Sequence, residues 1–87
     1  MMKIQIKYFA SIREAIGTHA ESVDVDASKV NTVAALRDSL MAKGAPYAQA
    51  LARGKSVRMA LDQTMCEESA QLKEGCEVAF FPPVTGG

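Results

Sequence analysis

Only one segment of this 87-residue chain is long and regular enough to form a substantial amphipathic helix. Between residues 32 and 43, apolar side chains recur at helical spacing and form a single stripe, made by Val33, Leu36, Leu40 and Met41. Asn31 or Thr32 can cap this helix, Gly44 ends it, and Pro46 prevents its continuation. A single apolar stripe must be buried against another element, so the rest of the chain has to supply a sheet.

Segments with alternating polar and apolar residues lie on both sides of that helix. We expect five strands, the fourth of them short, over residues 3–9, 21–25, 57–61, 65–67 and 76–81. Ser11 and Glu14 have the spacing of a capping box, which predicts a short helix that Gly17 ends. This order predicts an α+β fold with one mixed sheet, in which the first and last strands often lie side by side. It fits the ubiquitin-like β-grasp fold, and also a few ferredoxin-like variants.

Charge and composition exclude several classes of function. Ten basic and ten acidic residues cancel, so we expect no nucleic-acid partner and no membrane partner. The chain contains no stretch of 18 apolar residues that could cross a membrane, and its alternating N-terminus is unlike a signal peptide. We therefore expect a cytoplasmic protein. Cys66, Cys76 and His19 are too few for a structural zinc site, which needs four such ligands, so we expect no metal.

The C-terminus combines three features that point to chemistry. Pro82 and Pro83 end the last strand and favour extended chain, which divides the sequence into a domain, residues 1–81, and a tail, residues 82–87. Gly86 and Gly87 have no side chains, so their backbone can enter a channel too narrow for any other dipeptide. The terminal carboxylate is ionised at neutral pH and must be activated, for example as an acyl adenylate, before a nucleophile can attack it. A frayed terminus with incidental glycines is the alternative.

The alternation along the strands also predicts an apolar patch beside the tail. If Val78 and every second residue after it face the helix, Ala79 and Phe81 face solvent. Phe9 has the outward parity of the first strand and could meet Phe81 there, and Met65 could join them. Such a patch usually marks a protein interface. The alternative is that Phe9 packs under the first helix.

Three stretches carry a resemblance to a known family. The last eleven residues, 77–87, read EVAFFPPVTGG, the first strand and helix contain IKYFA followed by IRE, and the long helix contains Val33, Ala35, Leu36 and Arg37. Together they resemble the MoaD-type sulfur carriers, the small subunits of molybdopterin synthase in the MoaD/ThiS family. A terminal Gly-Gly alone is shared with the thiamine sulfur carrier and with ubiquitin-like modifiers, whereas the ending FFPPVTGG is far more specific.

The resemblance implies a ubiquitin-like β-grasp domain with one long helix, short helices and a flexible C-terminal Gly-Gly tail. It also implies a cycle in which an ATP-dependent enzyme, related to ubiquitin-activating enzymes, adenylates the terminal glycine. A sulfur donor then converts that glycine to a thiocarboxylate. The carrier docks on the large synthase subunit, in a heterotetramer, and donates sulfur to cyclic pyranopterin monophosphate during molybdenum cofactor biosynthesis. On this interpretation the carrier is not catalytic on its own and holds no permanent cofactor, because the activating enzyme consumes the ATP.

The resemblance also assigns roles to residues. Gly87 carries the sulfur, and the tail that enters the large subunit is formed by Pro83, Val84, Thr85 and Gly86. The partner-binding positions are Phe9, Met65 and Phe81, to which the outward parity of the last strand adds Ala79. Two residues depart from the pattern: Asp62 replaces a frequent Asn, and Cys76 replaces a polar residue. A sulfur carrier for another pathway, such as that of thiamine, and a ubiquitin-like modifier joined through Gly87 to lysines are the competing hypotheses.

Overall fold

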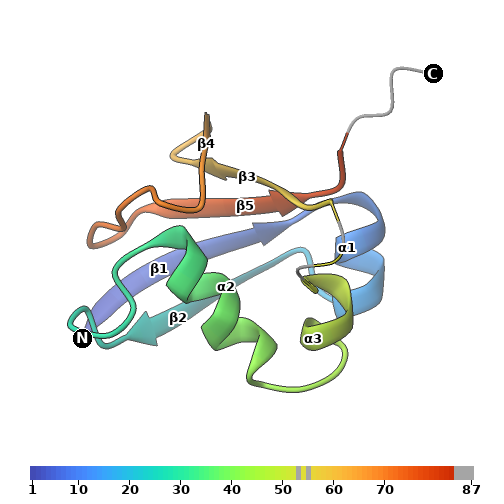
Figure 1. Cartoon of the computed structure of the whole chain (residues 1–87), viewed down its shortest axis with the longest axis horizontal. Helices are drawn as coiled ribbons and strands as arrows, with labels where there is room; N and C mark the ends of the chain where they lie inside the picture. The colour runs from blue at the N-terminus through green and yellow to red at the C-terminus, as the bar shows by residue number, and fades with distance from the viewer. Residues whose placement is uncertain (53, 55, 84–87) are drawn as a thin grey trace.

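A mixed five-stranded sheet is the frame of the protein (Figure 1). The computed structural model describes residues 1–52, 54 and 56–83. The strands are β1 (Met2–Tyr8), β2 (Ala20–Val25), β3 (Arg58–Leu61), β4 (Thr64–Cys66) and β5 (Glu77–Phe81). They lie in the order β2-β1-β5-β3-β4, and β1 and β5 pair in parallel whereas the other neighbours are antiparallel. The predicted adjacency of the first and last strands is confirmed.

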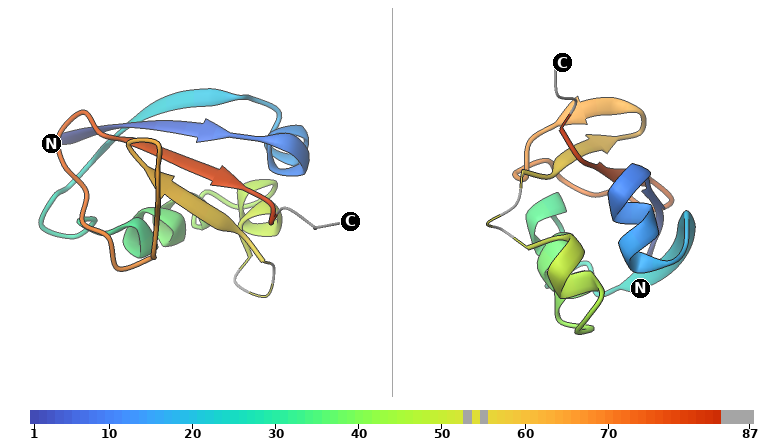
Figure 2. Two further views of the ribbon diagram at one scale, coloured as in Figure 1. Left: turned by 90° about the horizontal axis from the view of Figure 1, so that it is seen from above. Right: turned by 90° about the vertical axis from the view of Figure 1, so that its right-hand side faces the viewer.

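Helices cover only one face of this sheet. They are α1 (Ala10–Ile16), α2 (Val33–Met41) and α3 (Tyr47–Ala50). Figure 2 shows α2 and α3 on the same side of the strands, with α1 at the end of the sheet where β1 finishes. The other face carries none of the described helices. We call the two faces the inner and the outer face.

The core lies between α2 and the inner face. Its fully buried side chains alternate along the two central strands and follow the stripe of α2: Ile4, Ile6, Tyr8, Val33, Leu36, Leu40, Val78 and Phe80. Removing such apolar area from water contributes about 25 cal/mol per Å², which makes this layer the main source of stability. The predicted single stripe and its burial against a sheet are therefore confirmed.

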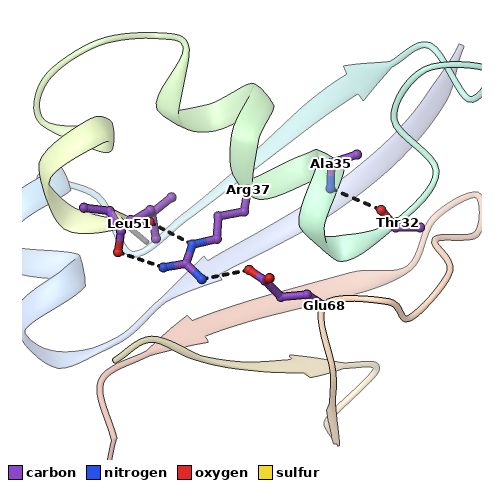
Figure 3. Close-up of polar contacts among 6 residues, drawn as sticks. Thr32, Ala35, Arg37, Leu51 and Glu68 are labelled. Atoms are coloured by element: carbon purple, nitrogen blue, oxygen red, sulfur yellow. Dashed lines mark hydrogen bonds and ion pairs between the residues drawn. The ribbon is translucent and has the colours of Figure 1, made fainter. Parts of the chain in front are cut away.

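Local signals set most of the helix ends. The hydroxyl of Thr32 accepts a hydrogen bond from the Ala35 amide at 3.2 Å, so Thr32 is the cap of α2 (Figure 3). Gly17 has a φ of 92° and its amide donates to the Arg13 carbonyl at 2.8 Å, so it ends α1 as expected.

The predicted capping box of α1 is wrong. The N-cap is Phe9, whose side chain makes no capping hydrogen bond, and Ser11 lies within the first turn. The chain turns out of β1 through Ala10, at a φ of 52°, and the helix therefore begins one residue before Ser11. The Phe9 carbonyl accepts hydrogen bonds from the amides of Ile12 and Arg13, so backbone groups begin the helix.

The two departures from the family pattern both fit the fold. Asp62 and Gln63 have positive φ and form the two-residue turn between β3 and β4. The Asp62 carboxylate accepts a hydrogen bond from the Glu77 amide at 2.9 Å, which ties this turn to β5. Cys76 is buried in the core as a small apolar residue.

Candidate functional site

Two alanines, Ala79 of β5 and Ala60 of β3, lie side by side in the middle of the outer face. The strand register aligns Lys7, Ala79, Ala60 and Met65 across β1, β5, β3 and β4. Phe81 lies two residues further along β5, on the same face and towards the tail. Since residues opposite one another in a sheet share a face, this row forms a continuous surface.

Two aromatic rings rise from this surface at the end where the tail leaves. The rings of Phe9 and Phe81 meet edge to face, with centroids 6.5 Å apart and planes at 83°. Phe9 is 46% exposed and Met65 is 58% exposed. The alternative that Phe9 packs under the first helix is therefore wrong. Phe9 and Met65 are exposed as predicted, whereas Phe81 is half-buried. We call Phe9, Ala60, Met65 and Phe81 the outer-face patch.

Ala79 is not exposed as the alternation predicted. It retains only 7% of its surface, although its side chain points to the outer face. β5 is the central strand, so Lys7 and Ala60 flank Ala79 on both sides and longer neighbours shelter its methyl group. Ala79 is thus part of the floor beneath the patch, and its contact with a partner stays a prediction.

An ion pair borders the patch on the side away from the tail. The Lys7 ammonium lies 3.3 Å from the Glu77 carboxylate, and both side chains are on the outer face. A partner that covers the apolar patch therefore meets a charged edge along β1 and β5. Such an edge adds little affinity, but it disfavours partners without complementary charge.

The tail begins beside the aromatic pair. The Phe9 amide donates to the Phe80 carbonyl at 3.1 Å, so the last residue before α1 is fastened to the end of β5. Pro82 and Pro83 are half-buried. The tail positions Val84, Thr85, Gly86 and Gly87 lie outside the described residues, so their assigned roles stay predictions. The four residues beyond Pro83 span at most about 13 Å when extended.

A buried arginine holds the segment that precedes β3 (Figure 3). Arg37 is 4% exposed, and its guanidinium donates to the carbonyls of Leu51 at 2.7 Å and Ala52 at 2.9 Å. It also pairs with the Glu68 carboxylate at 2.8 Å. From the sequence, Arg37 is only a match to the family pattern, and its burial is not predicted. A signal for its burial is present in the sequence, because Arg37 follows Val33 by four residues and so shares the apolar side of α2.

A second polar cluster joins the inner face to α3. The hydroxyls of Tyr8 and Tyr47 both donate to one oxygen of Glu21 at 2.8 Å, and Lys43 lies 3.7 Å from the other. Burial, with the hydrogen bond and charge of Glu21, raises the pKa of Tyr8 far above its ordinary value. Burial tends to raise the pKa of Glu21, but the two hydroxyls and Lys43 outweigh it and hold that pKa below its ordinary value. This cluster is a structural contact that was not anticipated.

The described part of the chain offers no alternative chemistry of the usual kinds. Over residues 1–52, 54 and 56–83, no group of three or more His, Cys, Asp or Glu side chains could hold a metal ion. Burial, followed by the charge of Glu67, raises the pKa of the Cys66 thiol, which disfavours a reactive thiolate. No helix in this described part is long and apolar enough to cross a membrane.

The sequence is similar to those of known proteins. Residues 6–87 match the ThiS family. The chain is similar to the molybdopterin synthase sulfur carrier subunit of Escherichia coli (strain K12), with 44% identity over 97% of this chain and 99% of the relative.

Solved structures share the fold. SAMP1 from Haloferax volcanii superposes with a TM-score of 0.74 at 26% identity, over 98% of this chain and 99% of that one. A second match is one chain of the complex of subunits 1 and 2 of the molybdopterin-converting factor from Helicobacter pylori 26695. It superposes with a TM-score of 0.67 at 21% identity, over 99% of this chain and 100% of that one. At that identity the second likeness shows the fold alone. The expected β-grasp architecture is confirmed.

Proposed function

This chain belongs to the ThiS family, and from that premise we propose that it is the sulfur carrier subunit of a molybdopterin synthase. One observation of the structure supports the proposal most. β5 ends at Phe81, whose half-buried ring contacts the exposed ring of Phe9, so the tail leaves the domain beside an apolar surface. A carrier needs both features, because its partner must hold the domain while the tail enters an active site.

The proposed chemistry takes place at Gly87. The carboxylate attacks the α-phosphorus of ATP on an activating enzyme, and pyrophosphate leaves. A persulfide sulfur from the donor then attacks the acyl carbon and displaces AMP, after which a thiol cleaves the sulfur–sulfur bond and leaves a thiocarboxylate. Sulfur transfer to the pterin precursor and hydrolysis return the carboxylate. ATP is consumed by the activating enzyme, so the carrier itself needs no resident cofactor.

We assign the acceptor reaction to the large synthase subunit, in a heterotetramer. The narrow end, Gly86 and Gly87, passes through the channel of that subunit, and Pro83, Val84 and Thr85 keep the tail extended behind it. The outer-face patch, with Ala79 in its floor, docks against the same subunit. General acids and bases come from the partner, since the described residues of the carrier offer no such set beside the tail.

A ubiquitin-like modifier is the second candidate, because the small archaeal modifier SAMP1 shares this fold at 26% identity. A modifier would use the same activated glycine, but would transfer it to lysine amines. Conjugates of higher mass in cell extracts would favour that reading. A carrier for thiamine biosynthesis would share the thiocarboxylate and would not bind the large synthase subunit.

The first test is mass spectrometry of the C-terminal peptide, after incubation with the activating enzyme, ATP and a sulfur donor. We expect sulfur in place of one carboxylate oxygen of Gly87. Fragment ions must locate the shift, because oxidation of any of the five methionines adds nearly the same mass. A plain carboxylate after this incubation would refute the carrier function.

A second test changes the length of the tail. One alanine added after Gly87 removes the glycyl carboxylate from its place, so we expect complete loss of molybdopterin synthesis and an unchanged melting temperature. The control is one alanine added before Met1, which is 88% exposed, and this variant should retain synthesis. An extended tail that still supports synthesis would contradict the mechanism.

A further inference from the structure

A small cavity lies on the opposite side of the tail base from the outer-face patch. Its volume is about 120 Å³, and it lies among α1, α3, the segment that leads into β3, and Pro82. Its floor is apolar and buried, because Ile12 and Ala50 are 4% and 5% exposed. An apolar cavity of about 150 Å³ is large enough to bind benzene, so this one has room for a valine or leucine side chain.

The rim of the cavity differs from its floor. Ser11, Ala15 and Ser56 line it and are exposed, so the cavity can be reached from outside. The floor offers no side-chain polar group to a water molecule, and a water that is poorly held is displaced favourably by an apolar group. The cavity therefore suits an aliphatic side chain, and two exposed serines lie on its rim.

The chain connects this cavity directly to the outer-face patch. Phe81 belongs to the patch, and the next residue, Pro82, forms a wall of the cavity. Phe9 belongs to the patch, and Ser11 of the rim follows two residues later. Patch and cavity thus lie on two sides of one tail base.

The length of the tail limits how far its carboxylate can lie from the domain. Gly87 ends the chain four residues after Pro83, so its carboxylate lies within about 13 Å of the described end of the domain. On the proposed function, a protein that holds this carboxylate in an enclosed site comes close to the tail base, where both the patch and the cavity lie.

The patch alone is also too small for a lasting subunit contact. A stable interface buries about 800 Å² on each partner, whereas a fully buried aromatic side chain supplies about 150–250 Å². Phe9 and Phe81 are already partly covered, and Ala60 and Ala79 are buried by their own neighbours. The inserted tail supplies part of the remaining area, and the cavity lies on the other side of the tail base, within reach of the same subunit.

We propose that this cavity receives an aliphatic side chain of the large synthase subunit when the tail is inserted. The proposal rests on the proposed function and adds a second contact to it, on the helical side of the tail. The carrier would then be gripped at its base between the patch and the cavity, which fixes the direction in which the tail enters.

The test fills the cavity from its rim. Ala15→Leu places a large side chain there and suits a helix, so the fold should be retained. We expect its affinity for the large subunit, measured by titration calorimetry with the full-length chain, to fall at least tenfold. Ala15→Ser keeps the space and should bind within about twofold of the unmodified chain. The matched control is Ala42→Leu, the same change at an exposed residue at the end of α2, which should also bind normally.

Three results would decide against the proposal in different ways. If the unmodified chain does not bind the large subunit, the proposed function itself fails. If it binds and Ala15→Leu binds equally well, only the cavity contact is refuted. If Ala15→Leu binds the large subunit normally but is adenylated more slowly, the occupant is the activating enzyme and the proposal is overturned. Ser56→Leu, which fills the cavity from the opposite rim, replaces Ala15→Leu if thermal unfolding shows that the latter does not fold.

Discussion

The two faces of β5 are built from adjacent residues, yet they serve different purposes. On the inner face, Val78 and Phe80 have no exposed surface, because they lie in the core beneath the helices. On the outer face, Ala79 is sheltered only by neighbouring strands, and Phe81 stays half-buried beside Phe9. The inner face stabilises the domain, whereas in the proposed function the outer face is the one that a partner covers. Substitutions on the two faces should therefore separate stability from binding.

The largest effect on stability is expected on the inner face. Phe80→Ala removes a ring that stacks on Tyr8 at a centroid distance of 6.3 Å, and should reduce the free energy of unfolding by about 3–5 kcal/mol. Phe81→Ala is the matched control, and should cost less than about 1.5 kcal/mol because its ring is already partly in water. Urea denaturation measures both. Equal losses at the two positions would remove the distinction between the faces.

The layer that covers the inner face depends in turn on Arg37. Arg37→Met keeps a long side chain but leaves the carbonyls of Leu51 and Ala52 without their donors, which should cost about 1–3 kcal/mol of unfolding free energy. Arg13→Met, at an exposed residue of α1, is the control and should change stability by less than about 0.5 kcal/mol. Chemical denaturation would contradict the role of Arg37 if both variants were equally stable.

The outer face should respond in binding rather than in folding. Phe81→Asp places a charge in the outer-face patch, and should weaken binding of the large subunit at least tenfold, which corresponds to about 1.4 kcal/mol. Its melting temperature should change by only a few degrees. Ser22→Asp adds the same charge on the same face but at the edge strand β2, and should bind normally. Unchanged affinity of Phe81→Asp in calorimetry would exclude the patch as the docking surface.

The smallest effect concerns the Glu21 cluster at the edge of the inner face. The pKa of the Glu21 carboxyl lies below the ordinary value of 4.5. The ionised carboxylate therefore stabilises the fold at pH values above 4.5, and this contribution is lost as the pH falls through the lowered pKa. Glu21→Gln should therefore be less stable than the unmodified chain near pH 7, and the difference should shrink as the pH falls below the ordinary value of 4.5.

Thermal unfolding across this range measures that difference. Glu14→Gln, at an exposed glutamate of α1, provides the comparison and should follow the unmodified chain near pH 7. If the gap between Glu21→Gln and the unmodified chain stayed constant with pH, the carboxylate would not be the stabilising group.

Local signals in the sequence determined a large part of this protein. Alternation indicated the strands, the stripe on α2 indicated the covering layer, and Thr32 and Gly17 set helix ends, because each of these depends on residues within one or two turns. The prolines ended the last strand at Phe81 as expected. The prediction that Ser11 caps α1 is wrong, because the helix begins at Ala10 with Phe9 as its N-cap.

Only the tertiary structure decided what the outer face and the tail base look like. Ala79 is buried because Lys7 and Ala60, from distant parts of the chain, flank it in the sheet. The cavity exists because α1, α3 and the segment before β3 converge on Pro82. Arg37 is buried because its guanidinium finds two carbonyls more than ten residues away. Exposure and cavities depend on which remote segments become neighbours, and no local pattern contains that information.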